Sequence, residues 1–246
     1  MMNLQICAPY EPCVYNCPFC VARTHPQHNH QFSNEWAERP DYYRAKLAAV
    51  FSDYKIDCVV ITGECDPTQN LAWAYDVIKV VRQFSDAPIE FQTHNLSLDE
   101  RTCPRDIDVL AYSITNAREY LSSWRCYKHP NAINRAVLIL TKELEFLNKD
   151  NFSTMGFDQI TFKALNQTES ESTNKWIEKY SAKDLSNFYE IMNSRNGSSV
   201  SIRVDTTCQK AEGRYYVFRS DGRVYGSWES ATPISIKAED IGIRIH

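Results

Sequence analysis

Short apolar, β-branched runs alternate with helix-like segments along most of this chain, and this alternation constrains the fold more than any other feature. Seven runs have the length and residue types of buried strands: Leu4–Cys7, Asp57–Thr62, Pro88–Thr93, Asp108–Thr115, Arg135–Leu140, Gln159–Ala164 and Val200–Val204. Between them, apolar residues recur at helical spacing in Tyr42–Tyr54, Leu71–Phe84 and Ala182–Asn193, and more weakly in Leu98–Arg105 and Lys142–Leu147. This order predicts an α/β fold with a parallel sheet and crossover helices.

Six or seven strand–helix units over residues 1–205 predict a TIM-like (β/α) barrel, complete or partial, rather than a short open sheet. The pattern changes after Asp205. Two aromatic runs, 215–218 and 224–228, flank Asp221-Gly222, which is a strong signal for a β-hairpin. We therefore expect residues 206–246 to form a short β-rich extension packed on the barrel.

Alternation predicts one polar face in three of the expected strands, those at 88–94, 159–164 and 200–205. The polar positions are Glu90, Gln92, His94, Thr161, Lys163, Ser201, Arg203 and Asp205. If helices cover the apolar faces, these side chains look into the barrel, where charges must be paired or solvated. The pattern thus favours an interior cavity that holds a ligand. The alternative is an open antiparallel sheet with one wet face.

Charge and hydropathy exclude several classes of protein. Lys+Arg 27 and Asp+Glu 31 give a net charge of −4, which disfavours a non-specific nucleic-acid binder and a polybasic membrane-surface protein. No apolar run approaches the ~20 residues that span a bilayer. The first residues lack the basic and apolar regions of a secretion signal. We expect a cytoplasmic protein.

Nine cysteines are many for 246 residues, and without a secretion signal we expect reduced thiols rather than disulfides. Cys13, Cys17 and Cys20 form one tight group shortly after the first expected strand, whereas the others are scattered. Three thiolates on a short irregular loop can converge on one metal centre. A four-iron cluster usually takes four protein cysteines, so three leave one iron open to an exogenous ligand.

The cysteine group resembles the C-x3-C-x2-C hallmark of the radical S-adenosylmethionine (SAM) superfamily, and Phe19 supplies the aromatic residue favoured before the third cysteine. A second element is also similar: Thr62-Gly63-Glu64 follows the second expected strand, where the family has Gly-Gly-Glu. Thr62 replaces the first glycine. The order of strands, cysteine loop and helices matches the family's partial six-strand barrel over residues 4–205.

The resemblance implies a cofactor pair. Cys13, Cys17 and Cys20 would hold a [4Fe-4S] cluster whose fourth iron binds the methionine moiety of SAM. Glu64, with the backbone of Thr62 and Gly63, would accept hydrogen bonds from the SAM ammonium group. Reductive cleavage of SAM would then release a 5′-deoxyadenosyl radical, which abstracts a hydrogen atom from the substrate.

Four further SAM contacts follow from the resemblance. Ser113 and Asn116 fall where the family places polar residues near the SAM ribose or carboxylate. Arg135 could pair with the SAM carboxylate, and an exposed charge at a strand start is its alternative. Phe19 would lie beside the adenine. A reducing partner such as flavodoxin or ferredoxin is implied as well.

Structural zinc is the alternative for the cysteines. His25, His28 and His30 follow Cys20, so a Cys3His site in a zinc-stabilised binding module is sterically possible. Such a module would explain neither Gly63-Glu64 after a strand nor the barrel-like alternation. The simpler interpretation of the three histidines is a solvated loop.

The motifs identify a cofactor and leave the substrate open. The chain has no second cysteine triplet, and it is too short for a cobalamin-binding domain. The polar residues Lys163, Arg203 and His94 favour a small polar or anionic substrate, such as a nucleotide, a nucleobase or an amino-acid-like molecule. The alternative enzyme is an activase that installs a glycyl radical on a partner protein.

Overall fold

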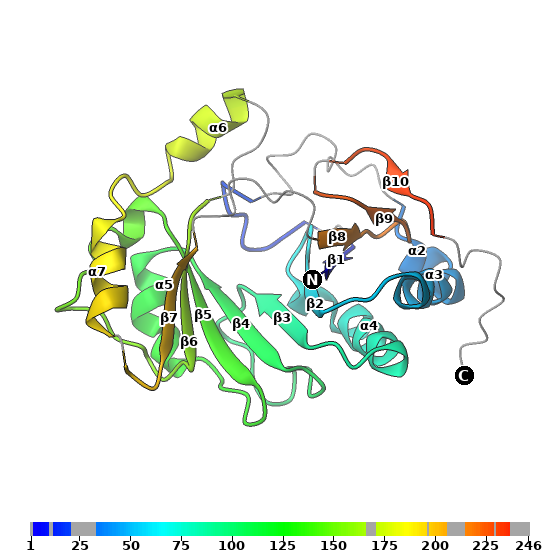
Figure 1. The fold of residues 1–246 in the computed structure, drawn as a ribbon, viewed down its shortest axis with the longest axis horizontal. Helices are drawn as coiled ribbons and strands as arrows, with labels where there is room; N and C mark the ends of the chain where they lie inside the picture. The colour runs from blue at the N-terminus through cyan, green and yellow to red at the C-terminus, as the bar shows by residue number, and fades with distance from the viewer. Residues whose placement is uncertain are drawn as a thin grey trace. The chain divides into compact units, whose positions relative to one another are not determined.

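The structure is a computed structural model that describes residues 2–9, 12–20, 33–165, 171–195, 197–205, 215–228 and 230–236. Contacts divide the chain into two compact units (Figure 1). The described residues of the first fall within Met1–Gln92, Pro104–Asp108 and Glu212–His246, and those of the second within Thr93–Cys103 and Val109–Ala211. No helix in these described ranges is long and apolar enough to cross a membrane.

The first unit contains a mostly parallel sheet with the strand order β10-β9-β8-β1-β2-β3. Strand β1 pairs in parallel with β2 on one side and with β8 on the other, and only β8-β9-β10 run antiparallel. Its elements are β1 (Asn3–Ala8), α2 (Glu35–Glu38), α3 (Pro40–Asp53), β2 (Cys58–Gly63), the 3-10 helix η2 (Pro67–Asn70), α4 (Leu71–Phe84), β3 (Ile89–Thr93), β8 (Tyr215–Phe218), β9 (Val224–Tyr225) and β10 (Pro233–Ile234).

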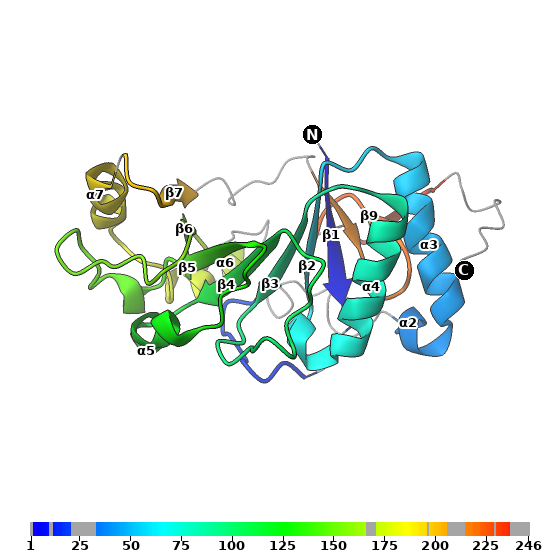
Figure 2. The same ribbon diagram turned by 90° about the horizontal axis from the view of Figure 1, so that it is seen from below.

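Helices α3 and α4 lie side by side on one face of this sheet (Figures 1 and 2). The face between them and the strands is apolar, with Leu4, Ile6, Val59 and Trp73 fully buried. On the opposite face, Cys7 of β1 packs in one cluster with Val217, Tyr225 and Trp228. The carboxy-terminal hairpin is thus an edge of the first unit's sheet, joined to it through β8.

The second unit contains the parallel sheet β4-β5-β6-β7. Its elements are β4 (Val109–Ile114), α5 (Ala117–Ser122), the 3-10 helix η3 (Ser123–Arg125), β5 (Ile133–Ile139), the 3-10 helix η4 (Lys142–Leu144), β6 (Gln159–Lys163), α6 (Glu171–Glu178), α7 (Ser186–Ser194) and β7 (Ser201–Asp205). The parallel pairing in both units overturns the antiparallel alternative for the seven expected strands.

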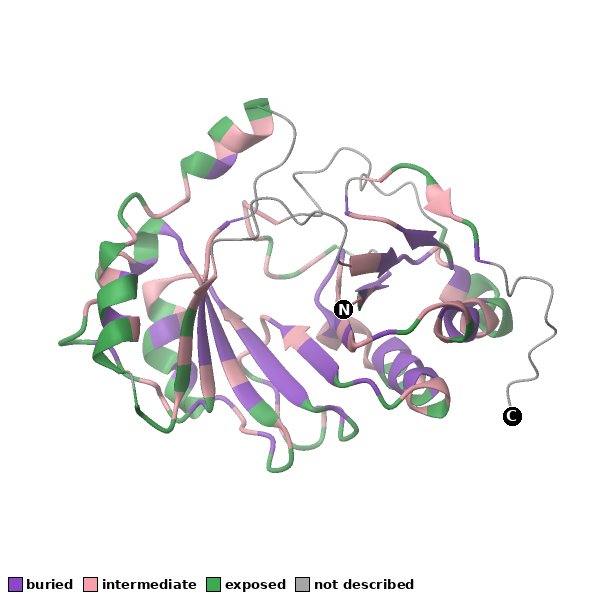
Figure 3. Cartoon of the chain, viewed as in Figure 1, coloured by how far each residue is buried: buried purple, intermediate pink, exposed green. Residues whose placement is uncertain are grey.

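Aromatic rings form the core between the second sheet and the helices that pack on it. Phe162 of β6 lies 5.6 Å from Phe152 and 5.1 Å from Phe188 of α7, measured between ring centroids. Figure 3 shows buried residues along the strands and exposed residues on the outer side of α7. Helices therefore cover the apolar face of this sheet, as the strand alternation predicts.

The structure confirms all seven expected strands and corrects three of the expected helices. Helix α4 coincides with the expected segment, and α3 begins earlier, at Pro40, because proline suits the first turn of a helix. The segment expected to be helical at 98–105 forms turns instead, since the Asp99 carboxylate accepts hydrogen bonds from the backbone of Arg101 and Thr102. Only a 3-10 turn forms within 142–147.

The third corrected helix was expected over Ala182–Asn193, and it starts later, at Ser186. Ala182 donates its amide to Leu140, and Thr141 forms a β-bridge with Ser181, so the chain is extended where the helix was expected to begin. The Asp184 side chain then accepts a hydrogen bond from the Ser186 amide, where α7 begins. A tertiary pairing overrides the local pattern here.

The aromatic core permits a matched test within α7. Phe188 is fully buried, whereas its neighbour Tyr189 is 40% exposed. Phe188→Ala should lower the free energy of unfolding by about 3–5 kcal/mol, because it removes a buried ring and leaves a cavity. Tyr189→Ala should lower it by less than about 1 kcal/mol. Urea denaturation of the metal-free proteins measures both, and equal losses would contradict this assignment of the core.

Candidate functional site

The three clustered cysteines lie on a loop that follows the carboxyl end of β1. Two backbone turns shape it: Asn16 donates its amide to the Cys13 carbonyl, and Cys20 donates to the Cys17 carbonyl, both at 3.2 Å. Asn16 has a φ of 47°, a left-handed conformation that asparagine tolerates well. The loop thereby places three half-buried cysteine side chains, those of Cys13, Cys17 and Cys20, within one short segment.

The thiols are close in sequence, and the described residues contain no group of three or more His, Cys, Asp or Glu side chains already arranged around a metal position. His25, His28 and His30 of the zinc alternative lie outside the described ranges. Among the other described cysteines, Cys7, Cys65, Cys103 and Cys126 are buried, as expected of small apolar side chains. The assignment of the three loop cysteines as metal ligands stays a prediction.

Gly63 ends β2 directly opposite Ala8, the last residue of β1. A Cβ on Gly63 would lie 2.2 Å from the backbone nitrogen of Ala8, so this position accepts only glycine without movement of the backbone. The next residue, Glu64, is 3% exposed. The close approach of the two strands thus brings a buried carboxylate next to the point where the cysteine loop leaves β1.

The segment after Glu64 holds the cysteine loop. Cys65 Sγ donates to the Pro9 carbonyl at 3.1 Å. The Gln69 carboxamide bonds the loop twice: its Oε1 accepts from the Val14 amide at 3.1 Å, and its Nε2 donates to the Pro12 carbonyl at 3.2 Å. Sequence reasoning missed Gln69, which has no motif of its own.

Tyr15 and Phe19 are the half-buried aromatic residues of this loop. A side-chain hydrogen bond joins Tyr15 to Thr68 of η2. Burial, followed by the charge of Asp66, raises the pKa of Tyr15 to about 12, so the phenol stays neutral at physiological pH. The expected place of Phe19 beside an adenine ring is not tested by these contacts.

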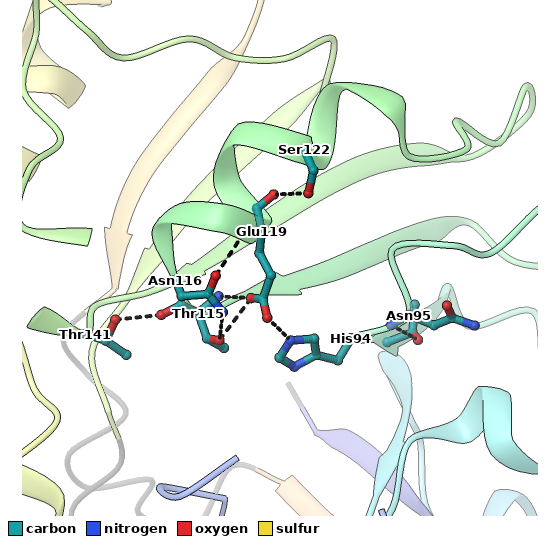
Figure 4. A network of polar contacts seen from close by, with 8 residues as sticks. His94, Asn95, Thr115, Asn116, Glu119, Ser122 and Thr141 are labelled. Atoms are coloured by element: carbon teal, nitrogen blue, oxygen red, sulfur yellow. Dashed lines mark hydrogen bonds and ion pairs between the residues drawn. The ribbon is translucent and has the colours of Figure 1, made fainter. Parts of the chain in front are cut away.

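In the second unit, His94 forms a hydrogen-bond contact with Glu119 of α5, with 2.8 Å between Nε2 and Oε1 (Figure 4). The other carboxylate oxygen accepts from the Thr115 amide at 2.7 Å and hydroxyl at 2.9 Å. Thr141 in turn donates to the Thr115 carbonyl at 2.6 Å. This network fixes the carboxylate against the imidazole.

The balance of two effects sets the pKa of Glu119. Burial alone raises the pKa of this carboxyl, but the hydrogen bonds from His94 and Thr115 outweigh it and lower the pKa below its usual value. Glu119 is therefore ionised at neutral pH. Sequence analysis named His94 and missed Glu119, although Asn116 and Glu119 have the spacing of a helix-capping pair.

Asn116 and Arg135, two of the residues expected to contact SAM, have other partners. The Asn116 Oδ1 accepts the Glu119 amide at 2.9 Å and caps α5. Arg135 Nε donates to Gln159 Oε1 on the neighbouring strand at 2.9 Å. Ser113 belongs to β4 and is half-buried. Their roles toward a cofactor remain predictions.

The predicted polar face is present on β6 and β7, and it continues into an apolar cluster on β4 and β5. Register places Val137, Thr161 and Arg203 in one row, and Ile139, Lys163 and Asp205 in the next. Arg203 is exposed, and its Nε donates to Thr161 Oγ1 at 3.1 Å. The structure thus brings Lys163 and Arg203 to one face near the carboxyl ends of β6 and β7.

Comparison with solved structures identifies the fold. Native anSMEcpe with bound AdoMet matches with a TM-score of 0.60 at 11% identity, over 94% of this chain and 76% of that chain. The chain has the fold of a radical SAM enzyme. The same protein with AdoMet and Kp18Cys peptide gives 0.58 at 15% identity, over 92% and 74% of the two chains.

Coproporphyrinogen III oxidase (HemN) from Escherichia coli, a radical SAM enzyme, matches with a TM-score of only 0.42 at 12% identity, over 78% of this chain and 51% of that chain. No protein-family model and no curated protein matches the sequence. The likeness to anSMEcpe confirms the expected α/β partial barrel with a carboxy-terminal hairpin.

The close approach at Gly63 can be tested without any cofactor. Gly63→Ala should lower the free energy of unfolding by about 1–3 kcal/mol, because the added Cβ would clash with the Ala8 backbone. Gly226→Ala is the matched control, since a Cβ there has its nearest neighbours at 3.7 Å. Thermal and urea unfolding of the metal-free proteins measure the difference. A Gly63→Ala variant as stable as the control would refute the constraint.

Proposed function

We propose that this chain is a radical SAM enzyme that acts on a small polar or anionic substrate. One observation carries the proposal: the Cys13–Cys20 loop at the end of β1 is bonded to the segment that begins with Gly63-Glu64 at the end of β2. The two motifs that suggest the cofactors are thus neighbours in a fold shared with an AdoMet-bound enzyme.

The residues of the loop fit a [4Fe-4S] cluster. Cys13, Cys17 and Cys20 are each half-buried, so none of the three side chains is shut away in the core. Thiolates are the protein ligands of such clusters, and three of them leave one iron for another ligand. When bound, the cluster would supply the electron for reductive cleavage of SAM, with flavodoxin or ferredoxin as the reductant.

Glu64, Thr62 and Gly63 would bind the SAM ammonium group. A carboxylate and a cation form a charge-assisted hydrogen bond, which is stronger than a neutral one. Glu64 is nearly fully buried, so water competes less for its oxygens. The absence of a side chain on Gly63 lets β1 and β2 approach closely and so keeps Glu64 near the start of the cysteine loop. Ser113, Asn116, Arg135 and Phe19 are proposed further SAM contacts.

Lys163, Arg203 and His94 are proposed to face the substrate. Lys163 and Arg203 share one sheet face, and His94 is held by the ionised Glu119. Cationic and hydrogen-bonding side chains at the carboxyl ends of parallel strands suit an anionic or polar ligand.

A second candidate function is action on a peptide or protein. The glycyl-radical activase belongs to this class of enzyme. This second candidate is favoured by the solved structures of anSMEcpe with bound Cp18Cys and Kp18Cys peptides.

The cluster and the reaction are tested together. After anaerobic reconstitution with iron and sulfide, the protein should form 5′-deoxyadenosine from SAM and dithionite, because a reduced cluster cleaves SAM. Cys17→Ala should abolish the product, whereas Cys58→Ala, a half-buried cysteine outside the loop, should retain it. Chromatography of the nucleoside measures both. Colourless protein that holds zinc and leaves SAM intact would instead support the zinc-stabilised binding module.

The SAM contact of Glu64 is tested by binding. Glu64→Gln should raise the Kd for SAM about 10- to 100-fold, the equivalent of about 1.5–3 kcal/mol for a hydrogen bond to a charged group. Equilibrium dialysis of the reconstituted protein measures the Kd. Glu38→Gln, at an exposed position on α2, is the control and should bind SAM as the unmodified chain does. Equal SAM affinities for the unmodified chain and both variants would mean that Glu64 does not contact SAM.

A further inference from the structure

We propose that Gln69 is a positioning residue for the metal-binding loop, which it holds by bracketing Cys13. This inference rests on the proposed function, in which Cys13 is a metal ligand. Its basis is a pair of hydrogen bonds from one side chain to the two backbone groups that flank this cysteine: the Val14 amide at 3.1 Å and the Pro12 carbonyl at 3.2 Å.

A carboxamide is chemically suited to this bracket. It presents one acceptor and two donors at the end of a single side chain, so it can satisfy an N–H and a C=O at once. A carboxylate could only accept, and an aliphatic side chain could do neither. The two bonds therefore restrain the peptide groups before and after Cys13, and with them the direction of its thiol.

The backbone that carries Gln69 is itself anchored. The Asp66 carboxylate accepts from the Thr68 amide at 2.9 Å and from the Thr68 hydroxyl at 2.7 Å, and Asp66 is only 6% exposed. On the other side, Asn70 accepts the amide of the fully buried Trp73 at 3.1 Å and caps α4. Gln69 thus projects from a fixed turn rather than from a mobile surface segment.

Within the described part of the loop, backbone hydrogen bonds form two turns, at Cys13–Asn16 and Cys17–Cys20. The bonds to Gln69 lie at an exposed position, so water can replace them when the side chain is changed. Loss of the bracket should therefore loosen the geometry of the thiols and leave the stability of the fold almost unchanged.

The same short segment begins with Glu64 and ends with Gln69. One element therefore places the carboxylate proposed for SAM and restrains the loop proposed for the cluster. This arrangement explains why a glutamine outside both motifs would matter for the metal site.

Cobalt(II) binding to the metal-free protein provides the test, because thiolate-to-cobalt charge-transfer absorbance reports the ligands directly. Gln69→Met keeps the length of the side chain and removes both hydrogen bonds. We expect about tenfold weaker Co(II) binding and altered cobalt d–d bands, because a loop without these restraints must be ordered when the metal binds. Gln83→Met, at an exposed position on α4, is the matched control and should bind Co(II) normally. Gln69→Ala should repeat the result of Gln69→Met.

The outcomes separate this inference from the proposed function. If Cys13→Ala weakens Co(II) binding but Gln69→Met does not, the bracket has no positioning role and the metal site stands. If Cys13→Ala binds Co(II) as the unmodified chain does, the loop is not the metal site and the proposed function fails. If both Gln69 variants lose thermal stability in proportion to affinity, Gln69 is structural and the inference is wrong. Weaker binding at unchanged stability, with a shifted EPR signal after iron–sulfur reconstitution, supports it.

Discussion

The contact between the backbones of Ala8 and Gly63 is the constraint on which the proposed site depends. Parallel pairing of β1 and β2 continues to this last pair of residues, and the missing side chain lets the two chain segments touch. The cysteine loop leaves from one side of the contact and Glu64 follows on the other. A side chain of any size at residue 63 would separate the two motifs.

Side-chain amides and carboxylates then fix the positions of the groups that the backbone brings close together. Gln69 restrains the loop around Cys13, and Asp66 restrains the turn that carries Gln69. In the second unit, Glu119 is held by Thr115 and in turn holds His94 (Figure 4). In both units, polar side chains at the carboxyl ends of parallel strands are positioned by other polar side chains, as preorganised sites require.

Much of the architecture could be predicted because it depends on local pattern. Strand periodicity located β1 to β7, and the Asp221-Gly222 turn located the hairpin. Other features could not be predicted this way. Helix α7 starts at Ser186 because Ala182 pairs with Leu140, a contact with no local signal. Helix α5 was missed, although Asn116 and Glu119 form the capping pair that marks its start.

The sequence by itself determined the α/β fold class, the cysteine loop and the Gly-Glu turn, because each is encoded by periodicity or by spacing within a few residues. Only the tertiary structure showed that Gln69 brackets Cys13 and that Glu119 pairs with His94. These partners are 55, 57 and 25 residues apart in sequence. Such contacts arise when parallel strands bring their carboxyl ends to one edge, and no local pattern specifies which side chains then meet.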